Sequence, residues 1–242
     1  MTELIHNKVY YKIFDKTHDR CSLIFDKKKI GSEIKLAEIE RNKQLVIDQF
    51  AAKKLVILKQ IHSNKIIDAD VNHIKIPAAD GLISTQKGVV LAIKTADCVP
   101  VLFFCTSGSV IGAAHCGWRG TKDDIIKNIV SRMVKKGATD IKAVIGPAII
   151  QDSYEVGAEY YSNFIESSSD YKKFFTHSVK DDHYMFDLPS FVKHKLDQEQ
   201  VTIVDHINED TYSNEAKYPS YRRYCHNGEE YRQNILSTIV IR

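Results

Sequence analysis

The chain has 242 residues, of which 43% are hydrophobic and 27% are charged, and its formal net charge is +3. These values are ordinary for a globular protein, and no run of about 18 apolar residues qualifies as a transmembrane helix. The one tight basic run, residues 27–29, is too short to outline a nucleic-acid groove. We therefore expect a soluble protein that binds neither membranes nor nucleic acid.

The N-terminal segment and the cysteines indicate the compartment. The first residues contain no apolar stretch or cleavage site of the kind found in signal peptides. Five cysteines stand at irregular spacing, and this odd number argues against a disulfide framework and for a reducing compartment. We expect a cytoplasmic protein with at least one thiol free to act as a ligand or nucleophile.

In chain order, the first predicted elements are strands at 9–14 and 22–25 and a helix over about 33–51. Short runs that are apolar throughout then follow, at residues 55–58, 89–93, 99–104 and 110–114. Continuous apolar runs of this length are typical of strands buried on both faces. We therefore expect these segments to form the core sheet.

The clearest predicted helix follows these strands. Thr121 is its expected N-cap, with Asp124 three residues later completing a capping box, and Gly137 is its expected end. An apolar stripe at helical spacing lies between them, formed by Ile125, Ile126, Ile129, Val130 and Met133.

The rest of the chain mixes both element types. The predicted elements are a strand at 141–145, a helix after residue 154, a helix near 188–199, and strands at 201–204 and 237–241. Strands and helices do not alternate regularly, and we find neither an internal repeat nor a linker. The sequence predicts an α+β fold, with residues 1–242 forming a single domain.

Three residues at expected strand ends stand out. His62, Cys98 and His115 each follow or close an apolar run, and strand ends of one sheet can converge. Two imidazoles and a thiolate suit zinc, and three protein ligands leave the fourth position to water or substrate, as in catalytic sites. Their separations match no zinc finger or ribbon, so residue types alone leave open a surface histidine and a core cysteine.

The sequence motifs around these residues are more specific. The chain reads Gln60-Ile61-His62, Asp80-Gly81, Ala96-Asp97-Cys98-Val99-Pro100 and His115-Cys116-Gly117-Trp118-Arg119-Gly120, followed by Ile145-Gly146-Pro147, Tyr154-Glu155-Val156-Gly157 and Ser220-Tyr221-Arg222-Arg223. From about residue 40 to the end, the chain resembles the laccase-domain family of purine nucleoside phosphorylases, which also carries the label multicopper polyphenol oxidase.

The resemblance implies a layered α+β sandwich of mixed sheets flanked by helices. It makes His62, Cys98 and His115 zinc ligands. It also implies phosphorolysis of adenosine, inosine, guanosine and S-methyl-5'-thioadenosine, with adenosine deamination as a side activity. Copper is less favoured than zinc, because none of the 10 histidines forms the His-x-His pairs of multicopper sites.

The chain departs from the family pattern at several positions. Its N-terminal segment around residues 18–22 lacks the family's Gly-Gly-Val-Ser turn, and the family's Asn-Arg pair appears as Asn42-Lys43. Cys116 replaces an alanine, and we expect it in the core. Three later cysteines of the family are replaced, by Ala148, Ser153 and Asp210.

Lys43, Arg119 and Arg222 are candidate contacts for phosphate or substrate. Arg119 is expected near a helix N-terminus, where anions bind, and Lys43 would act as a point charge. Arg222 and Arg223 are expected on a strand, so that at most one of them faces the site. Asp97 is expected to face away unless the chain bulges.

Two other classes of function remain open. Cys98 with His115 as its base would suit a cysteine hydrolase or deamidase. A non-catalytic partner protein with a degenerate pocket would also agree with the altered N-terminal segment. We expect purine nucleosides and phosphate as binding partners, and either a monomer or a homodimer.

Overall fold

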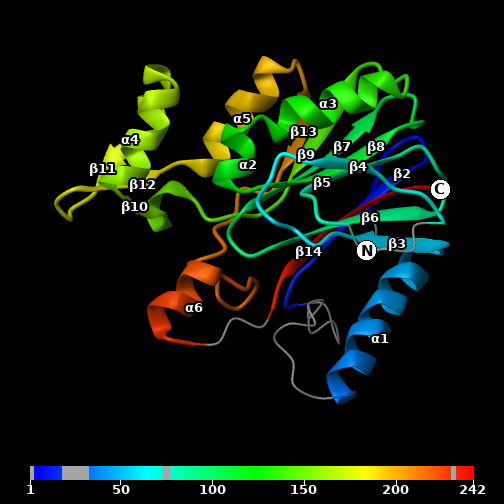
Figure 1. Cartoon of the computed structure of the whole chain (residues 1–242). Coiled ribbons are helices and arrows are strands. Elements are labelled where there is room, and N and C mark those ends of the chain that lie inside the picture. Colours follow the sequence, from blue (N-terminus) through cyan, green and yellow to red (C-terminus); the bar gives the residue numbers. More distant parts are fainter. Residues whose placement is uncertain (1–2, 18–32, 73–76, 230–232) are drawn as a thin grey trace.

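The apolar runs at 89–93, 99–104 and 110–114 form strands with both faces buried, whereas the run at 55–58 belongs to an edge strand that is only partly buried. These strands divide between two sheets, so the expectation of a single core sheet is wrong (Figure 1). The computed structural model describes residues 3–17, 33–72, 77–229 and 233–242. None of the described helices combines the length and apolar character needed to cross a bilayer. The expected strand at 22–25 and the altered turn at 18–22 lie outside the described residues.

One sheet has five strands in the order β1-β2-β14-β6-β3. Its strands are β1 (Glu3–His6), β2 (Val9–Phe14), β14 (Ile235–Ile241), β6 (Val89–Thr95) and β3 (Lys54–Ile57). Only β3 and β6 run parallel, and the other neighbours are antiparallel.

A second sheet has six strands in the order β13-β9-β7-β8-β5-β4. Its strands are β13 (Thr202–His206), β9 (Ile141–Ile145), β7 (Val99–Cys105), β8 (Ile111–Cys116), β5 (Gly81–Ser84) and β4 (Ile66–Asp68). A small third sheet consists of β10 (Glu155–Gly157), β12 (His183–Phe186) and β11 (Phe175–His177).

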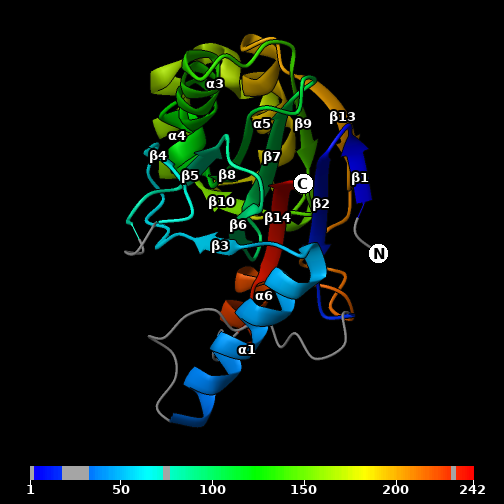
Figure 2. The same ribbon diagram turned by 90° about the vertical axis from the view of Figure 1, so that its right-hand side faces the viewer.

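Helices cover the outer faces of both large sheets (Figure 2). The described helices are α1 (Glu33–Phe50), α2 (Trp118–Lys122), α3 (Ile125–Lys135), α4 (Ala158–Ser167), α5 (Leu188–Gln198) and α6 (Tyr221–Asn227), with short 3-10 turns η2 (Gln151–Ser153) and η3 (Ser169–Phe174). Helix α1 packs on the five-stranded sheet, whereas α3 and α5 pack on the six-stranded sheet.

The two large sheets pack face to face, and this explains why their strands are apolar on both sides. In β6, Leu91 points into the core between the sheets, whereas Val90 points toward α1. In β7, Leu102 points between the sheets and Phe103 toward α3 and α5. The predicted α+β sandwich with flanking helices is confirmed as a four-layer arrangement.

The predicted capping box is wrong. Thr121 lies inside α2, where its hydroxyl donates to the carbonyl of Gly117 at 2.9 Å. Asp124 occupies the N-cap position of α3, has a left-handed φ of 66°, and its carboxylate accepts from Lys195 of α5 at 2.7 Å. The break between α2 and α3 separates the two residues, but the apolar stripe and the helix end before Gly137 are confirmed.

Candidate metal centre

The structure brings His62, Cys98 and His115 together, and we call them the ligand cluster. One ligand atom from each lies within 4.8 Å of the other two. The imidazole rings of His62 and His115 have centroids 4.9 Å apart and meet edge to face. The expected convergence of these residues is therefore observed.

Two of the three residues lie where the chain crosses from one large sheet to the other. His62 is on the crossover from β3 to β4, and Cys98 is on the crossover from β6 to β7. His115 lies near the end of β8, where β7 pairs with it in register Pro100 to His115. The strand-like segment before His62 ends at Ile57, so the expectation of a strand end was wrong for this residue.

Asp80 holds both histidines and was not assigned a role in the sequence analysis. Its carboxylate accepts from the backbone N–H groups of Ile61, His62 and Ser63, at 2.7–3.2 Å, and from the Ser63 hydroxyl at 2.8 Å. Nδ1 of His115 lies 2.9 Å from the same carboxylate. Because a carboxylate only accepts, Nδ1 carries a proton, and in the neutral imidazole Nε2 then presents the lone pair.

Charge within this network favours the ionised forms of Asp80 and Cys98, and the same two groups raise the pKa of His115 to about 9 despite its burial. Burial opposes ionisation of Asp80, but the hydrogen bonds from His115 and Ser63 outweigh it and lower the pKa to about 2. Burial also disfavours the Cys98 thiolate, yet His115 and His62 lower the thiol pKa below its ordinary value. Such a thiol readily supplies the thiolate that binds a metal.

Gly117 leaves the space in which the three side chains meet. A Cβ at this position would lie 3.2 Å from Sγ of Cys98 and 3.2 Å from Cδ2 of His62. Gly120, one turn later, packs against the loop that carries His62, where a Cβ would lie 2.7 Å from the carbonyl oxygen of Ser63. Both glycines allow α2 to approach the cluster closely.

This donor set fits a zinc ion. Zinc–nitrogen bonds of about 2.1 Å and zinc–sulfur bonds of about 2.3 Å place tetrahedral ligand atoms about 3–4 Å apart. The three ligand atoms of the cluster lie within 4.8 Å of one another, which allows one ion to bind all three after a small adjustment. Cys116 is fully buried with its side chain in the core, as predicted, and burial and the nearby Cys98 charge raise its pKa.

A second group of residues lies beside Cys98 and consists of Tyr154, Glu155, Thr211 and Arg222. We call this group the α6 wall. The carboxylate of Asp97 accepts from the Thr211 hydroxyl at 2.7 Å and from the backbone N–H of Arg222 at 2.6 Å. The guanidinium of Arg222 lies 5.1 Å from the ring centroid of Tyr154 and donates to the carbonyl of Glu155 at 2.7 Å. Burial raises the pKa of Tyr154 to about 12, and the Cys98 charge adds to this effect.

The expectation that Arg222 and Arg223 lie on a strand is wrong, because both belong to the first turn of α6. Arg223 is buried and donates to the carbonyls of Thr211 and Tyr218, so it is structural. Arg222 is only half-buried.

The other two predicted cations have partners elsewhere. Arg119 is exposed on α2, and its guanidinium lies 4.8 Å from the ring centroid of Trp118. Lys43 forms an ion pair with Glu40 at 2.7 Å on the same face of α1. Neither contact itself indicates an anion site.

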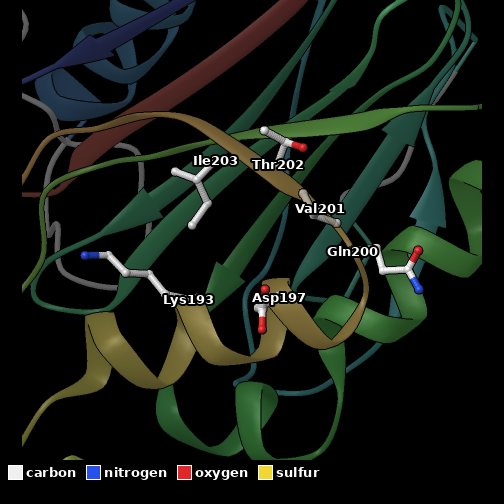
Figure 3. A pocket seen from close by; sticks show the side chains of 6 residues that line it. All are labelled: Lys193, Asp197, Gln200, Val201, Thr202 and Ile203. Carbon is white, nitrogen blue, oxygen red and sulfur yellow. The ribbon is translucent and has the colours of Figure 1, made fainter.

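A hollow between α5 and β13 is separate from the ligand cluster (Figure 3). Its lining side chains are Lys193, Asp197, Gln200, Val201, Thr202 and Ile203. One lysine and one aspartate balance each other, and none of these side chains is a metal ligand or nucleophile of the cluster. Among the described residues, His62, Cys98 and His115 form the group that could hold a metal.

Comparison with known proteins agrees with this geometry. A family model described as multi-copper polyphenol oxidoreductase laccase matches residues 28–240. The chain belongs to this laccase family. A Rickettsia conorii protein named purine nucleoside phosphorylase is 50% identical over 242 residues, which is 100% of both chains.

Two further similar proteins are informative. An adenosine deaminase from an unknown prokaryotic organism is 35% identical over 121 residues, which is 46% of each chain. The crystal structure of a Neisseria meningitidis protein superposes with a TM-score of 0.84 at 25% identity, covering 100% of this chain and 98% of that one. The family and fold expected from the sequence motifs are thus confirmed.

The three positions at which the laccase family was expected to carry further cysteines are neighbours in this structure. Ala148 and Asp210 form an isolated β-bridge, and the Ser153 hydroxyl donates to the Asp210 carboxylate at 2.7 Å. Backbone N–H groups of Tyr212 and Ser213 donate to the same carboxylate. A hydrogen-bonded aspartate therefore closes this loop without thiols.

Proposed function

We propose that the chain is a zinc-dependent purine nucleoside phosphorylase. Its substrates would be adenosine, inosine, guanosine and S-methyl-5'-thioadenosine together with phosphate, and adenosine deamination would be a side activity. The observation that carries the proposal is the ligand cluster, with Asp80 orienting its two histidines. The names of the relatives supply the substrate class.

His62, Cys98 and His115 would hold the zinc ion in this proposal. When bound, zinc supplies Lewis acidity and lowers the pKa of a bound water toward about 7. Asp80 keeps the proton of His115 on Nδ1, so that Nε2 faces the metal position. The donor set argues against a multicopper site, because a two-histidine, one-cysteine cluster lacks the many histidines that such a site needs.

The α6 wall would bind the anionic co-substrate. Arg222 is held near the cluster with one N–H group used by Glu155, and a planar guanidinium pairs with phosphate through two parallel hydrogen bonds. Phosphate placed there would be directed at C1′ of the ribose, while the departing purine receives a hydrogen bond or proton. Arg119 and Lys43 are secondary candidates for the same anion.

A cysteine hydrolase is the second candidate, and it is favoured by the lowered pKa of Cys98 beside His115. Iodoacetamide separates the two proposals. A metal-bound thiolate should resist alkylation until a chelator is added, whereas a free nucleophile should react without one. Alkylation at the same rate with and without chelator would favour the hydrolase.

The decisive experiment combines metal analysis with an assay. The purified protein should contain about one zinc per chain, and Cys98→Ala should lose it. Release of adenine from adenosine should then depend on phosphate, and a panel of the four nucleosides would rank the substrates. Absence of both phosphorolysis and deamination by zinc-loaded protein would favour a non-catalytic partner protein.

A further inference from the structure

We propose that Asp97 is the positioning residue that joins the metal-ligand loop to the α6 wall and thereby places Arg222 for the anionic co-substrate. The inference rests on the proposed function for the identity of that co-substrate. The mechanical part, that Asp97 fixes the start of α6, stands on hydrogen bonds alone.

The backbone at Asp97 interrupts the extended chain between β6 and β7. Its φ is 91°, in the region that residues other than glycine seldom adopt. The carbonyl of Asp97 accepts from the N–H of Ile149 at 2.9 Å, which ties the turn to the segment after β9. Asp97 can therefore direct its side chain to the α6 wall while the next residue, Cys98, takes part in the cluster.

Both oxygens of the Asp97 carboxylate are engaged by segments distant in sequence. Oδ1 accepts from the Thr211 hydroxyl and Oδ2 from the Arg222 N–H. Asp97 is 8% exposed and Thr211 is fully buried, so water competes little for these bonds. Hydrogen bonds to an ionised acceptor are stronger than those between neutral groups.

Helix α6 has only seven residues, so few hydrogen bonds within the helix hold it. It therefore depends on side-chain hydrogen bonds from other segments. Ser220 accepts from the N–H of Arg223, while Asp97 accepts from the N–H of Arg222. The two acceptors together satisfy adjacent backbone donors at the first turn. Loss of the Asp97 carboxylate would make this first turn of α6 more mobile. The guanidinium of Arg222, which belongs to the turn, would then lose its position.

The arrangement also argues against Asp97 as a general acid or base. A proton-transfer group needs an oxygen directed at the substrate, whereas the Asp97 carboxylate is buried and both of its oxygens are directed at the protein donors Thr211 and Arg222. Its function is to act through Arg222. This explains how a residue next to a metal ligand contributes without touching the reacting atoms.

The test compares Asp97→Asn with the wild-type holoenzyme. The amide keeps the size of the side chain, but its NH2 group faces either the Thr211 hydroxyl or the Arg222 N–H, so one of the two hydrogen bonds is lost. We expect about one zinc per chain to be retained, the KM for phosphate to rise about tenfold, and kcat to fall less than about threefold. Amide hydrogen exchange of residues 221–227 should accelerate, which tests the anchor without any assay of activity.

Thr211 provides a second variant and a control. Thr211→Val, which removes only the donor to Oδ1, should raise the same KM by a smaller factor, and Thr211→Ser should restore wild-type values. A hundredfold loss of kcat at unchanged KM in Asp97→Asn would overturn the proposal in favour of acid–base catalysis. Loss of zinc, or unchanged exchange in α6, would overturn it as well. A wild-type enzyme without phosphorolysis refutes the proposed function, while the exchange result still decides the anchor.

Discussion

The ligand cluster and the α6 wall are built in different ways, although Cys98 and Asp97 are adjacent. The cluster sits on the ends and crossovers of two packed sheets, and one carboxylate binds three consecutive backbone amides next to His62. The wall is a short helix and loops joined by single side-chain hydrogen bonds. We expect substitutions at the cluster to affect metal binding and substitutions in the wall to affect co-substrate binding.

Asp80→Asn should weaken zinc binding more than any other single substitution outside the ligands themselves. The amide cannot accept all the bonds made by residues 61–63 and His115, so both histidines lose their orientation. Outer partners of metal ligands contribute about 10–100-fold to affinity, and we expect the upper end for zinc. Competition with a chromogenic chelator measures the zinc affinity of this variant. An affinity within about threefold of wild type would show that sheet packing alone orients the cluster.

Gly117→Ala should weaken zinc binding by about tenfold while the fold is retained. The added methyl group meets Cys98 and His62, but the φ of −73° at this position suits any residue. Gly157→Ala is the matched control, because no atom lies within 4 Å of its Cβ position. The same zinc affinity in both variants would contradict the close approach of α2 to the cluster.

Arg222→Lys tests the wall and should leave zinc content unchanged. A lysine ammonium cannot reproduce the planar pair of hydrogen bonds, so we expect the KM for phosphate to rise about fivefold. Steady-state kinetics at varied phosphate concentration, with zinc measured on the same sample, provides the comparison. Zinc loss in this variant would erase the distinction between cluster and wall.

Cys116→Ala should have the smallest effect. This thiol is buried in the core and stays neutral, because burial raises its pKa. Removing it should cost about 1 kcal/mol of unfolding free energy, with zinc stoichiometry unchanged. Thermal unfolding and elemental analysis report the two quantities, and a zinc deficit would identify Cys116 as a fourth ligand.

The sequence predicted the buried strands well because burial on both faces produces continuous apolar runs such as that of β7, whereas the sandwich of two sheets was expected only from the family resemblance. Residue types made His62, Cys98 and His115 possible zinc ligands, and the family motifs around them selected them. Asp80 was missed as an orienting residue, since its role depends on amides that only the β3–β4 crossover brings to it.

Short helices were the other source of error. The break between α2 and α3 depends on a left-handed Asp124 held by Lys195, a residue 71 positions away. Arg222 and Arg223 were assigned to a strand because a seven-residue helix has too few turns to show a periodic pattern. Both features are decided by tertiary contacts.

The position of the ligand cluster on two sheet-to-sheet crossovers has a thermodynamic consequence. A metal held jointly by His62, Cys98 and His115 ties the seam between the sheets at one end, so its binding free energy adds to the cohesion of the sandwich. Chelation would then lower the free energy of unfolding of the sandwich. The metal would in this way stabilise the packing of the two sheets as well as take part in catalysis.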